Sequence, residues 1–133
     1  MPRKKLLLAD DDIDDRSFFL DFFEHHEEFE VLPSVESGLD LVNKLNTIVQ
    51  VEDLPDLIII DQNVPKMTGK QALEYLKADK RFAHIPVIIY STYRTEQLVV
   101  DCYRSGAAKV VSKPFSYEGY KKMINEFLSV LTA

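Results

Sequence analysis

The chain has 133 residues, of which 46% are hydrophobic and 29% are charged, an ordinary composition for one globular domain with its own core. Its net charge of −6 argues against nonspecific affinity for nucleic acid or for anionic membranes. The single cysteine, Cys102, has no intrachain partner, and no apolar run approaches the ~18 residues that cross a bilayer or resembles a signal-peptide core. We therefore expect one cytoplasmic domain over residues 1–133.

Short apolar runs alternate with segments of helical period along the chain, which is typical of an α/β protein with a parallel sheet. The first run, residues 6–9, precedes a helix for which Asp12 or Asp14 is a candidate N-cap. Four phenylalanines of this helix recur at helical spacing, so we expect them to form a stripe that covers the sheet. They are Phe18, Phe19, Phe22 and Phe23.

The middle of the chain continues the alternation. A second strand at about residues 30–33 precedes a helix that begins near Ser37. Residues 47–54 are expected to form an extended loop or a longer tail to that helix. A third strand at residues 57–60 precedes a helix that begins near Thr68.

The last part of the chain adds two more such units. A strand at residues 87–90 precedes a helix after Thr95, and Gly106 stands where a C-cap glycine belongs. A strand at residues 109–111 then precedes a final helix with a clear apolar stripe over residues 120–131. Five βα units with right-handed crossovers predict a doubly wound, five-stranded parallel sheet with helices on both faces.

Four of the apolar runs stop at polar residues that suit divalent-metal or phosphoryl chemistry. Ligands of open parallel sheets bind at the carboxyl ends of the strands, so we expect these side chains to form one site. The first and third runs end in acids, the fourth in hydroxyls and the fifth in an ammonium group. The residues are Asp10, Asp11, Asp12, Asp61, Ser91, Thr92 and Lys113.

Three carboxylates held close together need a cation. At 4 Å and an effective dielectric near 20, each pair repels by about 4 kcal/mol. Mg²⁺ is the natural cation because it prefers oxygen ligands, and Asp10, Asp11 and Asp61 are its predicted ligands. A carboxylate can act as a nucleophile toward phosphorus, and Lys113 and Ser91 would then offer partners to the phosphoryl oxygens.

Over essentially its full length the chain resembles the receiver domain of two-component response regulators, of the single-domain, CheY-like type. Four stretches carry the resemblance: residues 7–12 (LLADDD), 59–69 (IIDQNVPKMTG), 86–92 (PVIIYST) and 112–115 (SKPF). It implies a (βα)5 fold with the flavodoxin-like strand order 2-1-3-4-5. It also implies a phospho-acceptor switch in a phosphorelay, with no enzyme activity beyond self-phosphorylation from a donor and slow self-dephosphorylation.

The resemblance also implies the roles of the metal and acceptor residues. Asp61 would accept a phosphoryl group from a phosphohistidine on a sensor histidine kinase or a histidine phosphotransfer protein. Asp10 and Asp11 would bind Mg²⁺, aided by Asp61 and the main-chain carbonyl of Asn63.

Other positions follow from the same resemblance. Ser91 would stand at the Thr/Ser switch position and Lys113 at the invariant lysine. Asn63 and Tyr93, each two residues beyond a key position, would tune the lifetime of the phosphate. Pro114 is expected to follow a cis peptide bond.

Two positions depart from the family's usual pattern. Val110 stands where the family often has an aromatic ring that swings inward when the switch hydroxyl moves, so a different readout is needed here. Tyr90 or Tyr93 are candidates for it, although ordinary packing is the expected role of Tyr90. Gln62 is more polar than the usual residue after the acceptor, and the sequence offers no account of it.

The output is expected to be contact with an unidentified protein, because no DNA-binding or enzymatic segment follows residue 131. By family analogy the contact face is that of the fourth helix, fifth strand and fifth helix.

One alternative is a Mg²⁺-dependent phosphohydrolase of the haloacid-dehalogenase kind, with Asp10 as nucleophile and Asp12 as acid/base. That family needs an acidic pair after the lysine and a cap domain, whereas this chain has no acidic pair after Lys113 and no room for a cap domain. Another alternative is a receiver-like scaffold that is not phosphorylated, which the full set of acids argues against.

Overall fold

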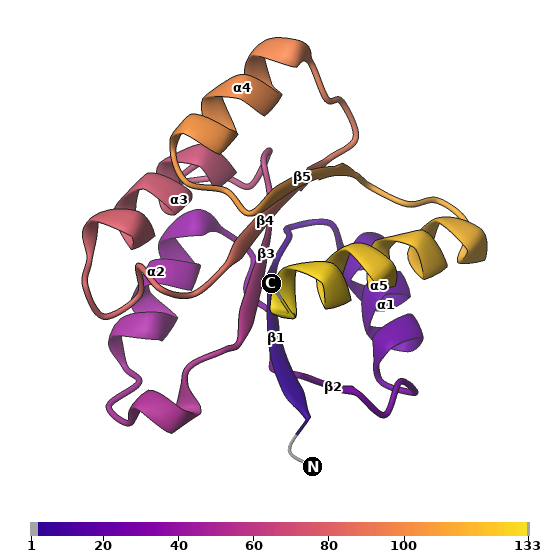
Figure 1. Cartoon of the computed structure of the whole chain (residues 1–133), viewed down its shortest axis with the longest axis horizontal. Helices are drawn as coiled ribbons and strands as arrows, with labels where there is room; N and C mark the ends of the chain where they lie inside the picture. The colour runs from indigo at the N-terminus through magenta and orange to yellow at the C-terminus, as the bar shows by residue number, and fades with distance from the viewer. Residues whose placement is uncertain (1–2, 133) are drawn as a thin grey trace.

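The computed structural model describes residues 3–132, which form one five-stranded parallel sheet with helices on both faces (Figure 1). In chain order the elements are β1 (Lys4–Ala9), α1 (Ile13–Phe23), β2 (Phe29–Val31), α2 (Gly38–Asn46), the 3₁₀ helix η1 (Val51–Asp53), β3 (Leu57–Asp61), α3 (Gly69–Ala78), β4 (Val87–Ser91), α4 (Glu96–Arg104), β5 (Lys109–Ser112) and α5 (Tyr117–Leu131). The strand order is β2-β1-β3-β4-β5. The predicted doubly wound α/β fold and its 2-1-3-4-5 order are confirmed.

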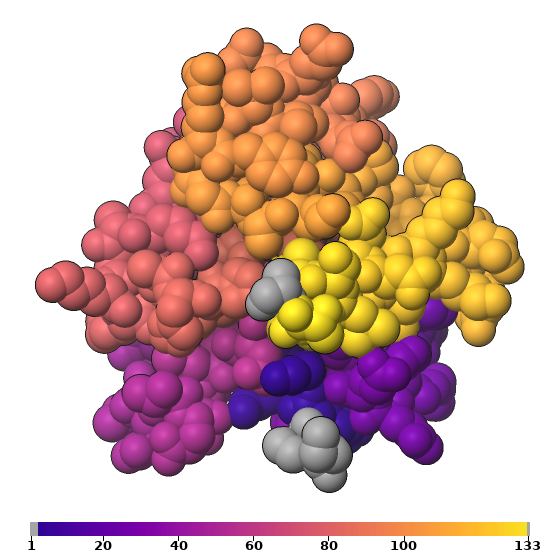
Figure 2. Space-filling model, in the orientation of Figure 1, coloured from indigo at the N-terminus to yellow at the C-terminus, as the bar shows by residue number. Residues whose placement is uncertain are grey.

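Apolar side chains of the strands form two core layers, one on each face of the sheet. β3 and β4 are buried along their whole length, as expected for central strands covered on both sides. In β1, Leu6 and Leu8 join the layer under α1 and α5, whereas Leu7 and Ala9 join the layer under α2, α3 and α4. Helices make up most of the surface seen in the space-filling view (Figure 2). The alternation of side chains along each strand decides which strand-end side chains share a face of the sheet.

The predicted phenylalanine stripe of α1 is only half correct. Phe19 and Phe23 are buried, with exposed fractions of 1% and 0%, and Phe22 is half-buried. Phe18 is 60% exposed, because a residue one position earlier is rotated by about 100° around the helix axis. The helix also exposes Ile13 on its outer surface, so its apolar residues are spread around the axis and are not confined to one stripe.

Side-chain caps fix where most helices begin. Asp12 Oδ1 accepts the N–H groups of Asp14 and Asp15 and so caps α1, which identifies Asp12 as the N-cap. Ser37, Thr68 and Thr95 cap the next three helices, and Ser116 caps α5, which therefore begins one turn before its apolar stripe. The expected C-cap glycine, Gly106, has a φ of 106°, which non-glycine residues rarely adopt.

Two boundaries in the middle of the chain differ from the sequence predictions. The second strand is Phe29–Val31 and not residues 30–33, because Pro33 has no N–H for regular pairing with β1. Residues 47–54 are neither wholly extended nor a tail of α2: they contain η1, whose turn closes through the Leu54 N–H and the Val51 carbonyl.

None of the helices in residues 3–132 combines the length and the apolar character needed to span a bilayer.

Candidate functional site

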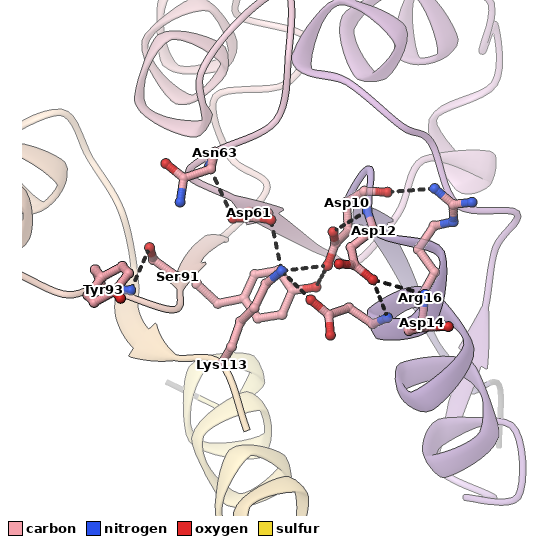
Figure 3. A network of polar contacts seen from close by, with 11 residues as sticks. Asp10, Asp12, Asp14, Arg16, Asp61, Asn63, Ser91, Tyr93 and Lys113 are labelled. Carbon is pink, nitrogen blue, oxygen red and sulfur yellow. Dashed lines mark hydrogen bonds and ion pairs between the residues drawn. The ribbon is translucent and has the colours of Figure 1, made fainter. Parts of the chain in front are cut away.

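Side chains from the carboxyl ends of four strands come together at one edge of the sheet (Figure 3). Asp10 follows β1, Asp61 ends β3, Ser91 ends β4 and Lys113 follows β5. Parallel pairing places the last residues of these strands opposite one another. Asp10, Asp61 and Ser91 are 0%, 4% and 1% exposed. The strand ends therefore converge as expected from the sequence.

The acids of this edge form a compact cluster. One carboxylate oxygen from each of Asp10, Asp11 and Asp61 lies within 4.8 Å of the others, with Asp11 exposed and the other two buried. Three carboxylates of this spacing fit a divalent cation that prefers oxygen ligands. Asn63 lies on an exposed turn after β3, and its N–H donates to Asp61 Oδ1 at 3.0 Å. The contribution of its carbonyl to a metal site stays a prediction.

Lys113 is the counter-charge of the cluster. Its Nζ lies 3.1 Å from Asp10 Oδ2, 2.8 Å from Asp61 Oδ2 and 2.6 Å from Asp15 Oδ2, and its side chain is only 10% exposed. Burial opposes the charged form, but the hydrogen bonds to Asp15 and Asp61 and the charges of Asp10 and Asp61 outweigh it and raise the pKa of Lys113. The group therefore stays an ammonium ion at neutral pH.

Asp15 was not among the site residues predicted from the sequence. It occupies the third position of α1, whose N-terminus the Asp12 cap fixes beside the site. In the sequence, Asp15 is marked only by its place about one helical turn after the acidic run. Acids in the first turn of a helix are common, because they interact favourably with the helix dipole, so this placement does not by itself indicate a site residue. Its contact with Lys113 depends on how α1 packs on the sheet.

Tyr90 combines packing with a polar contact in the site. Its ring is 2% exposed within the layer under α1 and α5, and its hydroxyl donates a hydrogen bond to Asp10 Oδ2. The Lys113 ammonium lies 5.0 Å from the centre of the ring. Burial, followed by the charge of Asp10, raises the pKa of Tyr90 well above its ordinary value, so the phenol remains a donor. The prediction of ordinary packing therefore missed half of its role.

The predicted switch hydroxyl faces the loop after β4. Ser91 Oγ accepts the N–H of Tyr93 at 3.3 Å and points toward that residue in the close-up view (Figure 3). Tyr93 itself is 79% exposed, so its ring stands free at the surface beside the site. The serine hydroxyl is thus held by the loop, and its role as a switch stays a prediction.

The structure explains the polar residue after the predicted acceptor. Gln62 Oε1 accepts the N–H of Lys70 at 2.9 Å, and the Gln62 carbonyl accepts the N–H of Gly69 at 3.2 Å. Both contacts tie the start of α3 to the end of β3. A Cβ at Gly69 would lie 2.9 Å from Gln62 Cα and 3.0 Å from the Asp61 carbonyl oxygen, so only glycine allows this close approach.

Val110 is buried at the position where the family often has an aromatic residue, and its backbone is bonded on both sides. Its N–H donates to the Tyr103 hydroxyl at 3.3 Å, and its carbonyl accepts from Arg94 at 2.9 Å. Arg94 belongs to the loop that holds Ser91, and Tyr103 belongs to α4.

The peptide bond before Pro114 is trans, since residues 3–132 contain no cis bond. The expectation of a cis bond is therefore wrong for this structure, which has the isomer that most X–Pro bonds adopt.

Comparisons with known proteins agree on one family. The family model described as response regulator receiver domain matches residues 6–125. The chemotaxis protein CheY of Listeria monocytogenes is 32% identical over 111 residues, which are 84% of this chain and 87% of that protein. Hybrid signal transduction histidine kinase D of Dictyostelium discoideum is 32% identical over 81 residues, and the match spans only 5% of its length. Several of the relatives are thus far longer than this chain.

Solved structures show the same architecture. The CheX–CheY–BeF3–Mg complex from Borrelia burgdorferi matches with a TM-score of 0.82 at 25% identity, covering 96% of this chain and 88% of that one. The Mn²⁺-bound form of response regulator Rcp1 matches with a TM-score of 0.79 at 24% identity, covering 95% and 92%. The second likeness concerns the fold alone.

Proposed function

Because the chain belongs to the response regulator receiver domain family, we propose that it is the phospho-acceptor switch of a two-component phosphorelay, with Asp61 as the acceptor. Receiver domains are signalling switches, and we expect no enzyme activity here beyond phosphorylation and dephosphorylation of the chain itself. One observation carries the choice of acceptor. Asp61 is one of two buried acids in the cluster and ends β3, the middle strand of the sheet, where it lies 2.8 Å from the Lys113 ammonium and within 4.8 Å of Asp10 and Asp11.

The donor would be a phosphohistidine on a sensor histidine kinase or a histidine phosphotransfer protein. A carboxylate oxygen of Asp61 attacks phosphorus, the P–O bond forms as the P–N bond breaks, and the imidazole leaves with its electron pair and then takes a proton from water. The Asn63 N–H, which already binds Asp61 Oδ1, orients the carboxylate for this attack.

Asp10, Asp11 and Asp61 would hold Mg²⁺, together with the main-chain carbonyl of Asn63. When bound, the cation neutralises charge on the acids and on the transferred phosphoryl oxygens. Lys113 supplies the second positive charge, because its ammonium already contacts Asp61. Ser91 supplies a hydroxyl to another phosphoryl oxygen after it leaves the Tyr93 N–H.

Phosphorylation would add roughly two negative charges beside residues that now hold Lys113 and Ser91. The rearrangement of these two side chains biases the surface formed by α4, β5 and α5, where an unidentified protein target would bind. We place the protein in the cytoplasm and expect neither nucleic acid nor membrane among its partners. We expect Asn63 and Tyr93, two exposed residues that each lie two positions beyond a key site residue, to set the lifetime of the phosphoryl group.

The test is phosphorylation by a small acyl phosphate with Mg²⁺, followed by intact mass. Wild type should gain one phosphoryl group and Asp61→Asn none, whereas the surface variant Asp53→Asn should behave as wild type. Equal labelling of wild type and Asp61→Asn would refute the assignment. Multiple turnover of a phosphomonoester that is lost in Asp10→Asn but kept in Asp61→Asn would instead support the dehalogenase-type hydrolase. A wild type that takes up no phosphate would support a scaffold.

A further inference from the structure

The carboxylate of Asp10 is held from three sides. Its Oδ1 accepts the Asp12 N–H at 3.0 Å, and its Oδ2 accepts both the Tyr90 hydroxyl and the Lys113 ammonium. A fully buried carboxylate needs such partners, because an unpartnered charge inside a protein is costly. Of the three, only the Tyr90 hydroxyl is a neutral side-chain donor, and it comes from β4, which β3 separates from β1.

Tyr90 is itself fixed independently of Asp10. It lies on β4 directly opposite Asp61 on β3, and its ring is packed in the same layer as Phe19 of α1 and Met123 of α5. The side chain is 2% exposed, so its ring has little freedom to rotate away. The packed ring therefore holds its hydroxyl in a fixed position close to β3, the strand that ends in Asp61.

We propose that Tyr90 is a positioning residue for the cation: its hydroxyl fixes the rotation of the Asp10 carboxylate, whose Oδ2 also contacts the Lys113 ammonium at 3.1 Å. This inference rests on the proposed role of Asp10 as a metal ligand. Without the hydroxyl, Asp10 Oδ2 keeps only the Lys113 ammonium as a side-chain partner, and the rotation of the carboxylate is no longer fixed. Removing a hydrogen-bonding partner of a metal ligand typically weakens metal binding by about 10–100-fold.

The direct measurement is calorimetric titration of the unphosphorylated protein with Mg²⁺. Tyr90→Phe keeps the ring and removes only the hydroxyl, and it should bind Mg²⁺ about tenfold more weakly than wild type or worse. Tyr120→Phe is the matched control: it removes a hydroxyl in the same layer from a ring that stacks on Phe22, and its affinity should stay within about twofold of wild type. Thermal unfolding of all variants shows whether the fold is retained.

A readout that simple destabilisation would not move is the Mg²⁺ dependence of phosphorylation by an acyl phosphate. Tyr90→Phe should need about tenfold more Mg²⁺ for half-maximal rate yet approach the wild-type rate at saturation. Tyr90→Met, which also lacks the hydroxyl, should show the same shift. Unchanged Mg²⁺ affinity in both Tyr90 variants would overturn the inference. If wild type binds Mg²⁺ but takes up no phosphate, the proposed function fails while the calorimetric test still decides the role of Tyr90.

A separate set of contacts joins the switch hydroxyl to the outer edge of the sheet. β5 is an edge strand, so only one of its sides is paired, with β4. The Lys113 N–H donates to the Ser91 carbonyl, and the backbone groups of every second residue of β5 before Lys113 therefore also face β4. Val110 faces away, so its N–H and carbonyl need other partners, and Tyr103 and Arg94 provide them.

We infer that Arg94 and Tyr103 form a clamp on Val110 that replaces the family's usual aromatic readout. Arg94 follows Tyr93, whose N–H binds Ser91 Oγ, so rotation of the serine toward a phosphoryl group moves the loop that carries the guanidinium. The clamp then opens and the edge of β5 is exposed between α4 and α5. This inference also rests on the proposed function.

Amide hydrogen exchange at Val110, measured by NMR, tests the clamp. With Mg²⁺ and beryllofluoride as the phosphoryl mimic, exchange should become about tenfold faster in wild type but not in Ser91→Ala. Tyr103→Phe, which lacks the hydroxyl that accepts the Val110 N–H, should exchange quickly without the mimic. Unchanged exchange at Val110 while the Asn63 amide resonance reports a bound mimic would overturn the clamp. Failure of the mimic to bind would count against the proposed function, and Tyr103→Phe with wild-type protection of the Val110 amide would then still refute the clamp.

Discussion

Replacing Lys113 by methionine should destabilise the protein strongly in the absence of Mg²⁺. The change keeps most of the length of the side chain and removes the only ammonium that contacts Asp10, Asp15 and Asp61 among the described residues. At 4.8 Å and an effective dielectric near 20, two carboxylates repel by about 3.5 kcal/mol, and the acidic cluster contains three such pairs at or within that distance. Loss of one partner from a buried ion pair typically costs about 3–5 kcal/mol, which is the decrease that we expect in the free energy of unfolding.

Mg²⁺ should recover a large part of this loss. A ligand present at 100 times its dissociation constant adds about 2.7 kcal/mol to the folded state. The gain should be larger in Lys113→Met than in wild type, because in wild type the cation competes with the ammonium for Asp10 and Asp61.

Urea denaturation followed by far-UV circular dichroism, with and without Mg²⁺, measures both effects. Lys122→Met, an exposed lysine of α5, is the control and should change the free energy of unfolding by less than about 0.5 kcal/mol. A loss of under about 1 kcal/mol in Lys113→Met, or an equal Mg²⁺ gain in both proteins, would refute the reasoning.

Three other predictions concern pH, a helix cap and the core. The pKa of Lys113 is raised in the folded state, so its contribution to stability is complete below its ordinary value of 10.5 and is lost as pH rises beyond it. The difference in unfolding free energy between wild type and Lys113→Met should therefore shrink in alkaline titrations. Asp12→Ala removes the cap of α1 and should cost about 1 kcal/mol in urea melts while acyl-phosphate labelling persists. Phe19→Ala should lower the free energy of unfolding by about 3–5 kcal/mol in urea melts, whereas Phe18→Ala at the exposed position should lower it by only about 0.5 kcal/mol. Equal losses of unfolding free energy would contradict the packing described for α1.

The residues that sequence reasoning located are those whose position follows from topology alone. Asp10, Asp61, Ser91 and Lys113 each end or follow an apolar run, and parallel strands must bring their carboxyl ends to one edge. Helix starts were equally accessible, since Ser37 and its counterparts are polar residues placed directly before helical periodicity. The helix starts depend only on neighbours in the chain, and the strand-end residues depend only on the rule that parallel strands bring their carboxyl ends to one edge.

What escaped prediction depends on the packing of side chains between elements. The contact of Asp15 with Lys113 joins residues 98 positions apart and requires the orientation of α1 on the sheet. The contact of Tyr90 with Asp10 spans 80 positions and crosses the intervening strand β3. Phe18 and Phe19 have the same residue type, and only a rotation of about 100° around the helix axis separates an exposed ring from a buried one.

The donor capacity of Lys113 limits how the site can respond to a phosphoryl group. An ammonium has three N–H donors, and in this structure three carboxylates, those of Asp10, Asp15 and Asp61, lie within reach of them. A phosphoryl oxygen on Asp61 must therefore displace one existing contact. The side chain of Asp15 is 37% exposed and that of Asp10 is 0% exposed, so water replaces the ammonium more readily at Asp15 than at Asp10. We therefore expect the bond to Asp15 to be the one that breaks on phosphorylation, which frees an acid at the N-terminus of α1 beside the acceptor.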